Sequence, residues 1–321
     1  MAKKEKVCYS GVGGQAVLEG VMMKNNEKYA VAVRKPDGEI DVKIDYFQGV
    51  LKENKLKKLP FIRGIFNFVE SLMLGMKSLN HSASFYEEEE EETRFDRTMD
   101  KLTRGKTEEV MTTLVTIFSI ALAVGIFIVL PYFLTSFLEK YIQSASIMAV
   151  IEGVVRIAIF ILYVWGISAM NDIKRLYRYH GAEHKCINCI EHGMELNVEN
   201  AMKSSRLHKR CGTSFMFFVM FVSIILFFFI RVDNRVLKVL ARIALMPVVA
   251  GISYEIIRLA GRSNNILVRI LSAPGMLIQR MTTKEPDEDM IRVAIASVEA
   301  VFDWKQYQKE NFGSDAEAKE A

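Results

Sequence analysis

Long apolar runs separated by charged segments dominate the middle of the chain. The runs cover Thr112–Tyr132, Ile147–Met170, Phe215–Ile230 and Val239–Leu259. A bilayer core about 30 Å thick is crossed by a helix of roughly 20 consecutive apolar residues. The pattern therefore predicts four transmembrane helices.

The N-terminal part has instead the two-residue period of β-strands. Tyr29–Arg34 and Ile40–Tyr46 alternate apolar and polar residues on either side of Pro36-Asp37-Gly38, which predicts an antiparallel hairpin. The preceding stretch, Gly11–Met23, is rich in glycine and permits a tight turn or a close approach of two backbones. It lacks the lysine and the following helix of a phosphate-binding loop, so nucleotide binding is not expected.

Helical spacing returns in Pro60–Leu79, where apolar residues recur with Arg63, Glu70 and Lys77 among them. This predicts an amphipathic helix that either lies in the membrane interface or, as we favour, packs on the transmembrane helices. The six successive glutamates Glu87–Glu92 repel one another, which predicts a solvated linker.

After the last apolar run, Ser263–Met281 is interrupted by Pro274-Gly275, which favours an interfacial or re-entrant helix over a fifth span. Pro286 and the acids after it are typical of a helix start. The expected fold is a mainly α membrane protein with a small β-containing cytosolic N-terminal domain. Its expected segments are the β-containing region (1–59), the amphipathic helix (60–82), an acidic linker (83–107), the four-span membrane domain (108–262) with a cytosolic loop (171–212), an interfacial segment and cytosolic helix (263–308) and a disordered tail (309–321).

Composition and charge support this expectation and orient it. The mean hydropathy is positive, +0.15, and no apolar secretory stretch follows the first residues, so no cleaved signal is expected. Cytosolic loops of membrane proteins carry the excess of Lys and Arg. Eight such residues lie between the second and third apolar runs, against four in the two opposite connections, which places both termini in the cytosol. The net charge of +4 includes no basic stripe typical of nucleic-acid binding.

Potential metal ligands are concentrated between residues 180 and 211, which hold four of the five histidines and three of the four cysteines. Cytosolic thiols rarely form structural disulfides. On a helix, His180, Glu183 and His184 would share one face, as two zinc ligands and a general base do in zinc hydrolases. Candidates for a third ligand are His208, Cys211, His192 and Glu195.

A second ligand set overlaps the first one. Cys186, Cys189, His208 and Cys211 have the spacing of a closed structural zinc site, in which four protein ligands leave no position for water. The two sets share His208 and Cys211, so they cannot both be complete. A third interpretation is that these side chains only cap helices or bind lipid head groups.

Charged residues near the ends of the apolar runs have two interpretations. Glu152 and Arg156 are four residues apart and are expected to form an ion pair, as are Glu255 and Arg258. Alternatively, Glu255 faces the histidine-rich loop, because an ionisable group at membrane depth is a functional candidate.

Several motifs together resemble a known family. The sequence contains HGAEH at 180–184, HKRCGT at 208–213, GGQAVLEGVMM at 13–23, PFIRG at 60–64, GISYEIIRLAG at 251–261 and TTKEPD at 282–287. With these motifs the chain resembles the DUF1385 family of bacterial membrane proteins of unknown function. In that family a threonine is usual where Cys186 stands here, so the resemblance favours the open set of His180, Glu183, His184, His208 and Cys211. It also implies a metal-dependent enzyme.

These patterns lead to one expectation and one alternative. The expectation is a multi-pass protein of the bacterial cell membrane that hydrolyses an amide or ester at the cytosolic membrane surface, with zinc or another divalent transition metal as cofactor and Glu183 as base. The expected partners are the lipid bilayer and either a membrane protein or a peptide substrate. The alternative is a non-enzymatic factor for membrane-protein assembly or transport, in which the loop is structural. A transporter is disfavoured because no pair of broken spans is visible.

Overall fold

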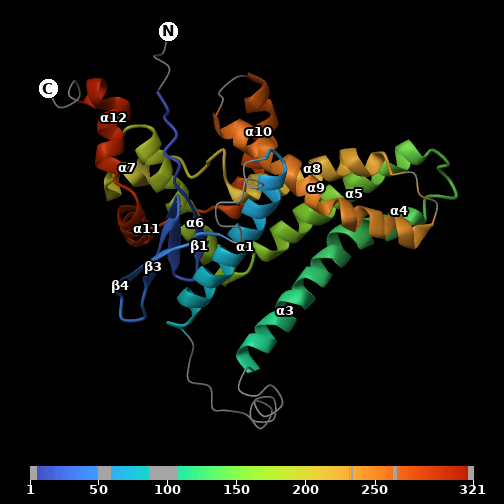
Figure 1. Cartoon of the computed structure of the whole chain (residues 1–321), viewed down its shortest axis with the longest axis horizontal. Coiled ribbons are helices and arrows are strands. Elements are labelled where there is room, and N and C mark those ends of the chain that lie inside the picture. The colour runs from blue at the N-terminus through green and yellow to red at the C-terminus, as the bar shows by residue number, and fades with distance from the viewer. Residues whose placement is uncertain are drawn as a thin grey trace. The chain divides into compact units, whose positions relative to one another are not determined.

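The structure of the chain is a computed structural model that describes residues 6–49, 59–86, 107–230, 232, 234–262 and 266–316. It divides into two compact units (Figure 1). The first consists of Met1–Tyr86, Val164–Val219 and Ala250–Ala321, and the second of Glu87–Tyr163 and Met220–Val249. The predicted linker at Glu87–Glu92 lies outside the described residues.

The first unit contains a four-stranded antiparallel sheet in the order β1-β2-β3-β4. Its strands are β1 (Gly13–Val17), β2 (Gly20–Asn25), β3 (Lys28–Arg34) and β4 (Ile40–Tyr46). The hairpin predicted from alternation is confirmed by the pairing of β3 with β4. The glycine-rich stretch forms β1 and β2, which alternation did not predict. The predicted close approach is also present, because a side chain at Gly20 would collide with the Ala32 carbonyl oxygen.

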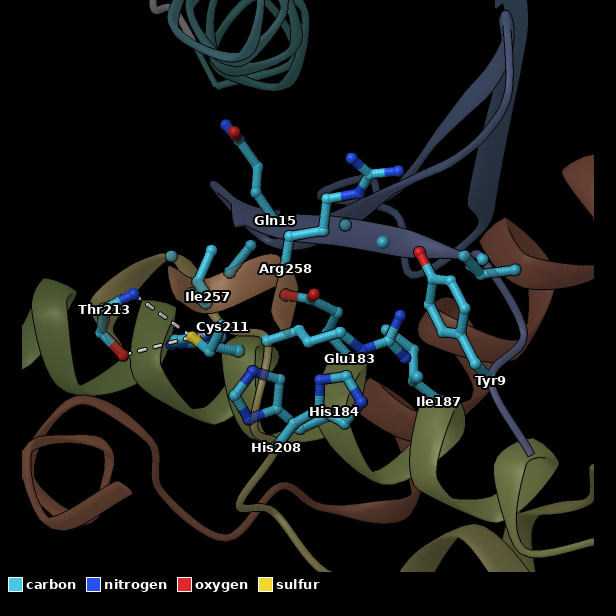
Figure 2. Close-up of a pocket in the computed structure, with 18 of the residues that line it drawn as sticks. Tyr9, Gln15, Glu183, His184, Ile187, His208, Cys211, Thr213, Ile257 and Arg258 are labelled. Carbon is cyan, nitrogen blue, oxygen red and sulfur yellow. Dashed lines mark hydrogen bonds between the residues drawn. The ribbon is translucent and has the colours of Figure 1, made fainter. Parts of the chain in front are cut away.

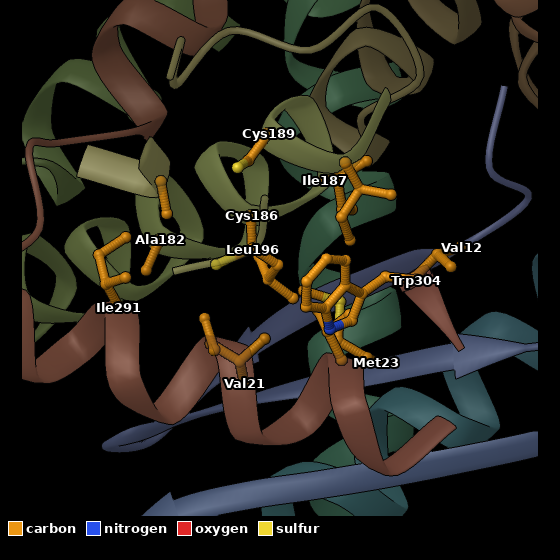
Figure 3. Packing of buried hydrophobic residues seen from close by; sticks show 14 of the residues in the cluster. Val12, Val21, Met23, Ala182, Cys186, Ile187, Cys189, Leu196, Ile291 and Trp304 are labelled. Carbon is orange, nitrogen blue, oxygen red and sulfur yellow. The ribbon is translucent and has the colours of Figure 1, made fainter. Parts of the chain in front are cut away.

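Both faces of the sheet are covered by helices. On one face Val21, Met23 and Ala32 share a core with α6 (Asn171–Glu191) and α11 (Glu288–Val301). Figure 3 shows Val21 and Met23 in this core beside Ala182, Cys186 and Ile291. The opposite face packs on α1 (Ile62–Ala83), the predicted amphipathic helix, and is formed by Val17, Met22, Tyr29, Val31 and Val33. The sheet, the segment expected as a cytosolic loop and the C-terminal helix therefore share one packed unit.

The first unit also contains α7 (Val198–Lys203), α10 (Ile266–Thr282) and α12 (Trp304–Ala316). Helix α10 contains Pro274 in its interior, in the segment predicted as an interrupted helix. Helix α12 occupies residues for which disorder was expected from residue 309 onward. It is held because Tyr307 and Phe312 are buried in the core beside the sheet. Residues 317–321 lie outside the described residues.

Among the described residues, three helices are long and apolar enough to cross a membrane: Val110–Ser136, Ala145–Ile167 and Arg235–Leu259. The first is formed by α3 (Thr107–Val124), the π-helical turn η2 (Gly125–Val129) and α4 (Leu130–Ser136), the second is α5 (Ala145–Ile167) and the third lies within α9 (Arg235–Arg262). The fourth expected span corresponds to α8 (Gly212–Phe228), which has only 17 residues.

A buried ionic cluster joins helices of the second unit. Arg156 donates to Glu152 at 2.7 Å, which confirms the expected pair, and Arg242 donates to the other carboxylate oxygen at 2.6 Å. All three residues are at most 6% exposed. Arg156 also donates to the Phe127 carbonyl at 3.0 Å and to Ser223 Oγ at 3.2 Å. A single carboxylate thus serves two guanidinium groups.

The expected pairing of Glu255 with Arg258 is wrong. Glu255 instead accepts a bidentate interaction from Arg63 of α1 and a hydrogen bond from the Phe61 amide at 3.2 Å. Close packing explains this choice, because the Cα of Gly251 lies 3.0 Å from the position that a Cβ of Gly64 would occupy. The start of α1 and the last turns of α9 therefore touch backbone to backbone.

We expect Glu152→Gln to destabilise the protein by roughly 3–5 kcal/mol, because removing one partner of a buried ion pair leaves uncompensated charge. Here two arginines would lose their shared carboxylate. Arg242→Met is the matched control and should cost less, since the pair between Glu152 and Arg156 remains. Thermal unfolding in detergent micelles measures both variants. Equal losses would contradict the shared role of Glu152.

Candidate functional site

Helix α6 carries the HGAEH motif through the centre of the first unit. The segment after α10 crosses it so closely that a side chain at Gly181 would collide with the Lys284 carbonyl oxygen. The Lys284 amide also donates to the Tyr177 carbonyl at 2.9 Å. Glycine at position 181 is therefore required by packing. On the other side, Ala182 and Cys186 are fully buried in the core beneath the sheet.

The two histidines of the motif each direct one ring nitrogen to a backbone carbonyl. His180 Nδ1 lies 2.9 Å from the Thr282 carbonyl oxygen, and His184 Nδ1 lies 2.7 Å from that of Arg206. A carbonyl oxygen can only accept a hydrogen bond, so both Nδ1 atoms carry a hydrogen, and in the neutral form of each ring Nε2 keeps the lone pair that a metal would need. Metal-binding histidines are commonly held in this way.

Cys211 completes a group of three ligands. One ligand atom each from His180, His184 and Cys211 lies within 4.8 Å of the others, and His180 Nε2 is 3.1 Å from Cys211 Sγ. The thiol stands at the N-terminus of α8, where the Thr213 amide donates to Sγ at 3.4 Å. Burial alone would raise the pKa of Cys211, but the two imidazoles hold that pKa well below its usual value.

The interaction between His180 and Cys211 also raises the pKa of His180. Burial would lower it, but the neighbouring Cys211 sulfur raises the pKa of His180 to about 9. A thiolate beside an imidazolium ion is thus the favoured state of these side chains without a metal. The donor set of two imidazole nitrogens and one thiolate is one that zinc accepts readily.

Glu183 lies beside this group and is only 4% exposed. Its Oε2 atom has no hydrogen-bond partner among the described residues. Burial raises the pKa of Glu183, while the nearby histidines and the Gly14 amide act in the opposite direction. An unpartnered carboxylate oxygen buried beside three potential ligands is what a general base in a metal site requires. The chemistry of these residues therefore fits a metal site.

The group opens into a cavity of about 520 Å³. Figure 2 shows that β1 forms one wall of the cavity, with Glu183, His184 and Cys211 facing it. Tyr9, Arg210 and Arg258 also line the cavity. The Arg210 guanidinium stacks 3.5 Å from the centre of the Tyr9 ring, so the N-terminal segment closes one end.

His208, a candidate third ligand, does not belong to the group of three. Its Nε2 lies 3.3 Å from Glu191 Oε2, although its ring is only 5.7 Å from that of His184. His192 directs its Nδ1 to the Asn188 carbonyl at 2.7 Å. Cys186 and Cys189 are fully buried in the apolar core. Among the described residues, the four ligands of the predicted closed site are therefore not brought together.

Sequence analysis missed the groups that orient the ligands. The carbonyls of Thr282 and Arg206 hold the two imidazoles, and a backbone carbonyl has no signature in a sequence. Gln279 was also missed. It accepts from the His208 amide at 2.9 Å and donates to the His208 carbonyl at 2.7 Å and to Ser214 Oγ at 2.8 Å. A lone amide within the apolar part of α10 was the available signal.

Comparisons with known proteins agree with the motifs. A family model described as "Protein of unknown function (DUF1385)" matches residues 59–304. The chain is also 34% identical over 304 residues to the "Uncharacterized protein YqhQ" of Bacillus subtilis (strain 168), an alignment that covers 93% of this chain and 94% of that protein. No solved structure matches the chain significantly.

Glu191 gives the site a predicted dependence on pH. Burial would raise its pKa, but His208 and Arg210 lower the pKa of Glu191 to about 2, below the usual 4.5. Its contribution to stability is therefore complete above pH 4.5 and is lost as the pH falls toward 2. From the difference between the two pKa values, the contribution is roughly 3 kcal/mol.

We expect Glu191→Gln to lower the free energy of unfolding at pH 7 and to flatten its decline between pH 5 and pH 3. Chemical denaturation at a series of pH values measures both effects. Glu199→Gln is the control, because Glu199 is exposed and pairs only with Lys203. An unchanged acid limb in the Glu191 variant would show that this carboxylate does not stabilise the site.

Proposed function

This chain belongs to the DUF1385 family, and from its own residues we propose that it is a metal-dependent hydrolase acting at the cytosolic membrane surface. His180, His184 and Cys211 would hold a zinc-type ion, and Glu183 would act as the general base. Three protein ligands would leave room for water or substrate, as in catalytic zinc sites.

One observation carries this proposal. Both imidazoles donate their Nδ1 hydrogens to backbone carbonyls and turn their Nε2 atoms toward one thiol. A purely structural helix face would not require two histidines with the same tautomer around one cysteine. The arrangement supports a site built for a cation.

Such a metal, when bound, supplies Lewis acidity that polarises a carbonyl and acidifies water. Glu183 then takes a proton from the attacking water and passes it to the leaving nitrogen or oxygen. The water oxygen bonds to the carbonyl carbon as the bond from that carbon to the leaving group breaks. The products are a carboxylate and an amine or alcohol. Burial favours this role, because it raises the pKa of Glu183 and so makes its carboxylate a stronger base.

A second candidate mechanism uses Cys211 as a nucleophile. The 3.1 Å contact between its Sγ and His180 Nε2 is the geometry of a thiolate and its acid–base partner. In that mechanism His180 protonates the leaving group after the thiolate attacks, and water later releases the acyl group. His184 and Glu183 have no comparable task in it, which is why we favour the metal.

The location at the membrane rests on two helices as well as on the three candidate spans. The buried face of α1 consists mostly of small or polar residues, Gly64, Glu70, Gly75, Ser78 and Ser82, with Leu74 packing into the core of the sheet. Its opposite face is apolar and exposed, formed by Phe61, Val69, Leu72, Met73, Met76 and Leu79. Exposed Ile266, Ile270 and Leu277 form a similar stripe on α10. Such faces suit the membrane interface, where the sequence had instead favoured packing for α1.

We expect Glu183→Gln to keep equimolar zinc and to lose hydrolysis at least a hundredfold, because it removes the proton acceptor without removing a ligand. Metal content by mass spectrometry and turnover of p-nitrophenyl acetate measure the two effects. His184→Ala should lose the metal, whereas Cys186→Ser should retain both metal and activity.

Zinc absent from wild-type protein purified without chelator would overturn the metal site. Hydrolysis that survives chelation but is abolished by alkylating Cys211 would instead support the cysteine mechanism. Full function of the Glu183→Gln variant together with a stably co-purifying membrane protein would favour the non-enzymatic alternative.

A spin label on the apolar face of α1 should show that this face lies in lipid. We expect nitroxides at Leu72→Cys and Met76→Cys, in zinc-loaded protein carrying Cys8→Ser, to be more accessible to oxygen than to a water-soluble nickel chelate in phosphatidylglycerol-containing vesicles. Lys43→Cys on the exposed edge of the sheet is the matched control and should show the reverse. Equal accessibility to the nickel chelate at all three positions would place α1 in water.

A further inference from the structure

Strand β1 is both an edge of the sheet and a wall of the cavity. Among the described strands it pairs only with β2. The stretch Gly11–Ala16 lines the same cavity as His180 and Glu183. The backbone of an edge strand therefore faces the space in which the proposed chemistry takes place.

The register of the hairpin shows which backbone groups point into that space. Val17 pairs with Gly20 across a two-residue turn, and such flanking residues exchange backbone hydrogen bonds. Hydrogen-bonded pairs alternate with non-bonded pairs along an antiparallel ladder, so the amides and carbonyls of Gly14 and Ala16 point away from β2. The Gly14 amide is already hydrogen-bonded to Glu183, so Gly14 offers its carbonyl to a ligand and Ala16 offers both of its backbone groups.

Gly13 is a glycine that packing does not explain. A Cβ at this position would have no described atom within 4 Å, and its φ lies outside the left-handed region. At neighbouring Gly14, in contrast, a Cβ would collide with the Met22 carbonyl oxygen. Glycine in a strand often marks a place where another backbone approaches closely. The open space beside Gly13 is such a place.

Arg258 supplies a positive charge in the same cavity. It makes no hydrogen bond or ion pair with any described residue, whereas Arg210, the other arginine of the lining, is paired with Glu191. Its neighbour Glu255 is already bound by Arg63. An acidic group of a ligand would complement Arg258.

We propose that β1 binds an extended segment of a substrate polypeptide by strand addition, with Gly14 and Ala16 as backbone partners and Arg258 holding a carboxylate of the bound segment. The inference rests on the proposed hydrolase and names its substrate class. A polypeptide fits better than a lipid ester, because a row of alternating amides and carbonyls is complementary to another backbone and not to an acyl chain. The scissile amide then lies beside Glu183.

The test uses zinc-loaded Glu183→Gln protein in detergent micelles, which should bind peptides without cleaving them. A synthetic library of random dodecapeptides is the probe, and mass spectrometry identifies the retained members. We expect retention to fall at least tenfold when Gly13→Val is added, because the side chain fills the approach to β1. Arg258→Met should selectively lose peptides that contain Asp or Glu.

Proline variants check the orientation of the strand. Ala16→Pro removes an amide that points to the cavity, so it should unfold at nearly the same temperature but retain few peptides. Gln15→Pro removes an amide of the ladder with β2 and should destabilise the sheet. If Gly13→Val itself fails to fold, the comparison of Ala16→Pro with Gln15→Pro still shows whether β1 binds peptides.

No retention above that of an empty micelle would overturn strand addition, as would equal retention by folded Gly13→Val and Ala16→Pro proteins. Failure of the hydrolase is separately visible. Peptides retained by β1 together with no hydrolysis by wild-type protein, of either the library or p-nitrophenyl acetate, would keep the peptide site and reject the enzyme. Ester hydrolysis without peptide retention would keep the enzyme and reject the peptide site.

Discussion

Close packing on both sides of helix α6 is the constraint on which the rest of the first unit depends. Beneath the helix, Ala182 and Cys186 fit into the core formed with β2 and α11. Above it, the segment after α10 crosses at Gly181, where no side chain fits. These contacts fix the rotation of the helix about its own axis. His180, Glu183 and His184 are thereby turned into the cavity, and the carbonyl of Thr282 is brought to the His180 ring.

The same packing makes the buried charges tolerable. An isolated ion in a protein interior is strongly disfavoured unless it is paired and hydrogen-bonded. Cys211 is compensated by two imidazoles and by a helix N-terminus. Glu191 accepts from Ser10, His208 and Arg210. The exception is Glu183, whose Oε2 has no partner among the described residues. Beside charges that are paired in this way, one carboxylate oxygen without a partner indicates chemistry more than stability.

Much of the fold could be predicted from periodicity. The β3-β4 hairpin, the amphipathic helix α1 and three membrane-length helices follow from local patterns of apolar residues. Strands β1 and β2 were missed because glycine weakens the alternation that identifies a strand. The partner of Glu255 was also missed, since Arg63 is remote in sequence and meets it only after the two glycines of α1 and α9 have packed. Local spacing favours a neighbour four residues away, and tertiary packing overrode it.

The candidate site was also predicted only in part from the sequence. His180 and His184 share a helix face, so their spacing was enough to relate them, whereas Cys211 joins them through the fold alone. Cys211 begins α8, and Ile257 and Arg258, in the last turns of α9, line the same cavity. Two apolar helices therefore meet the ligand group at or near their ends. A site formed at helix ends, with a glycine-rich strand as its opposite wall, suits the extended chain that we propose as its substrate.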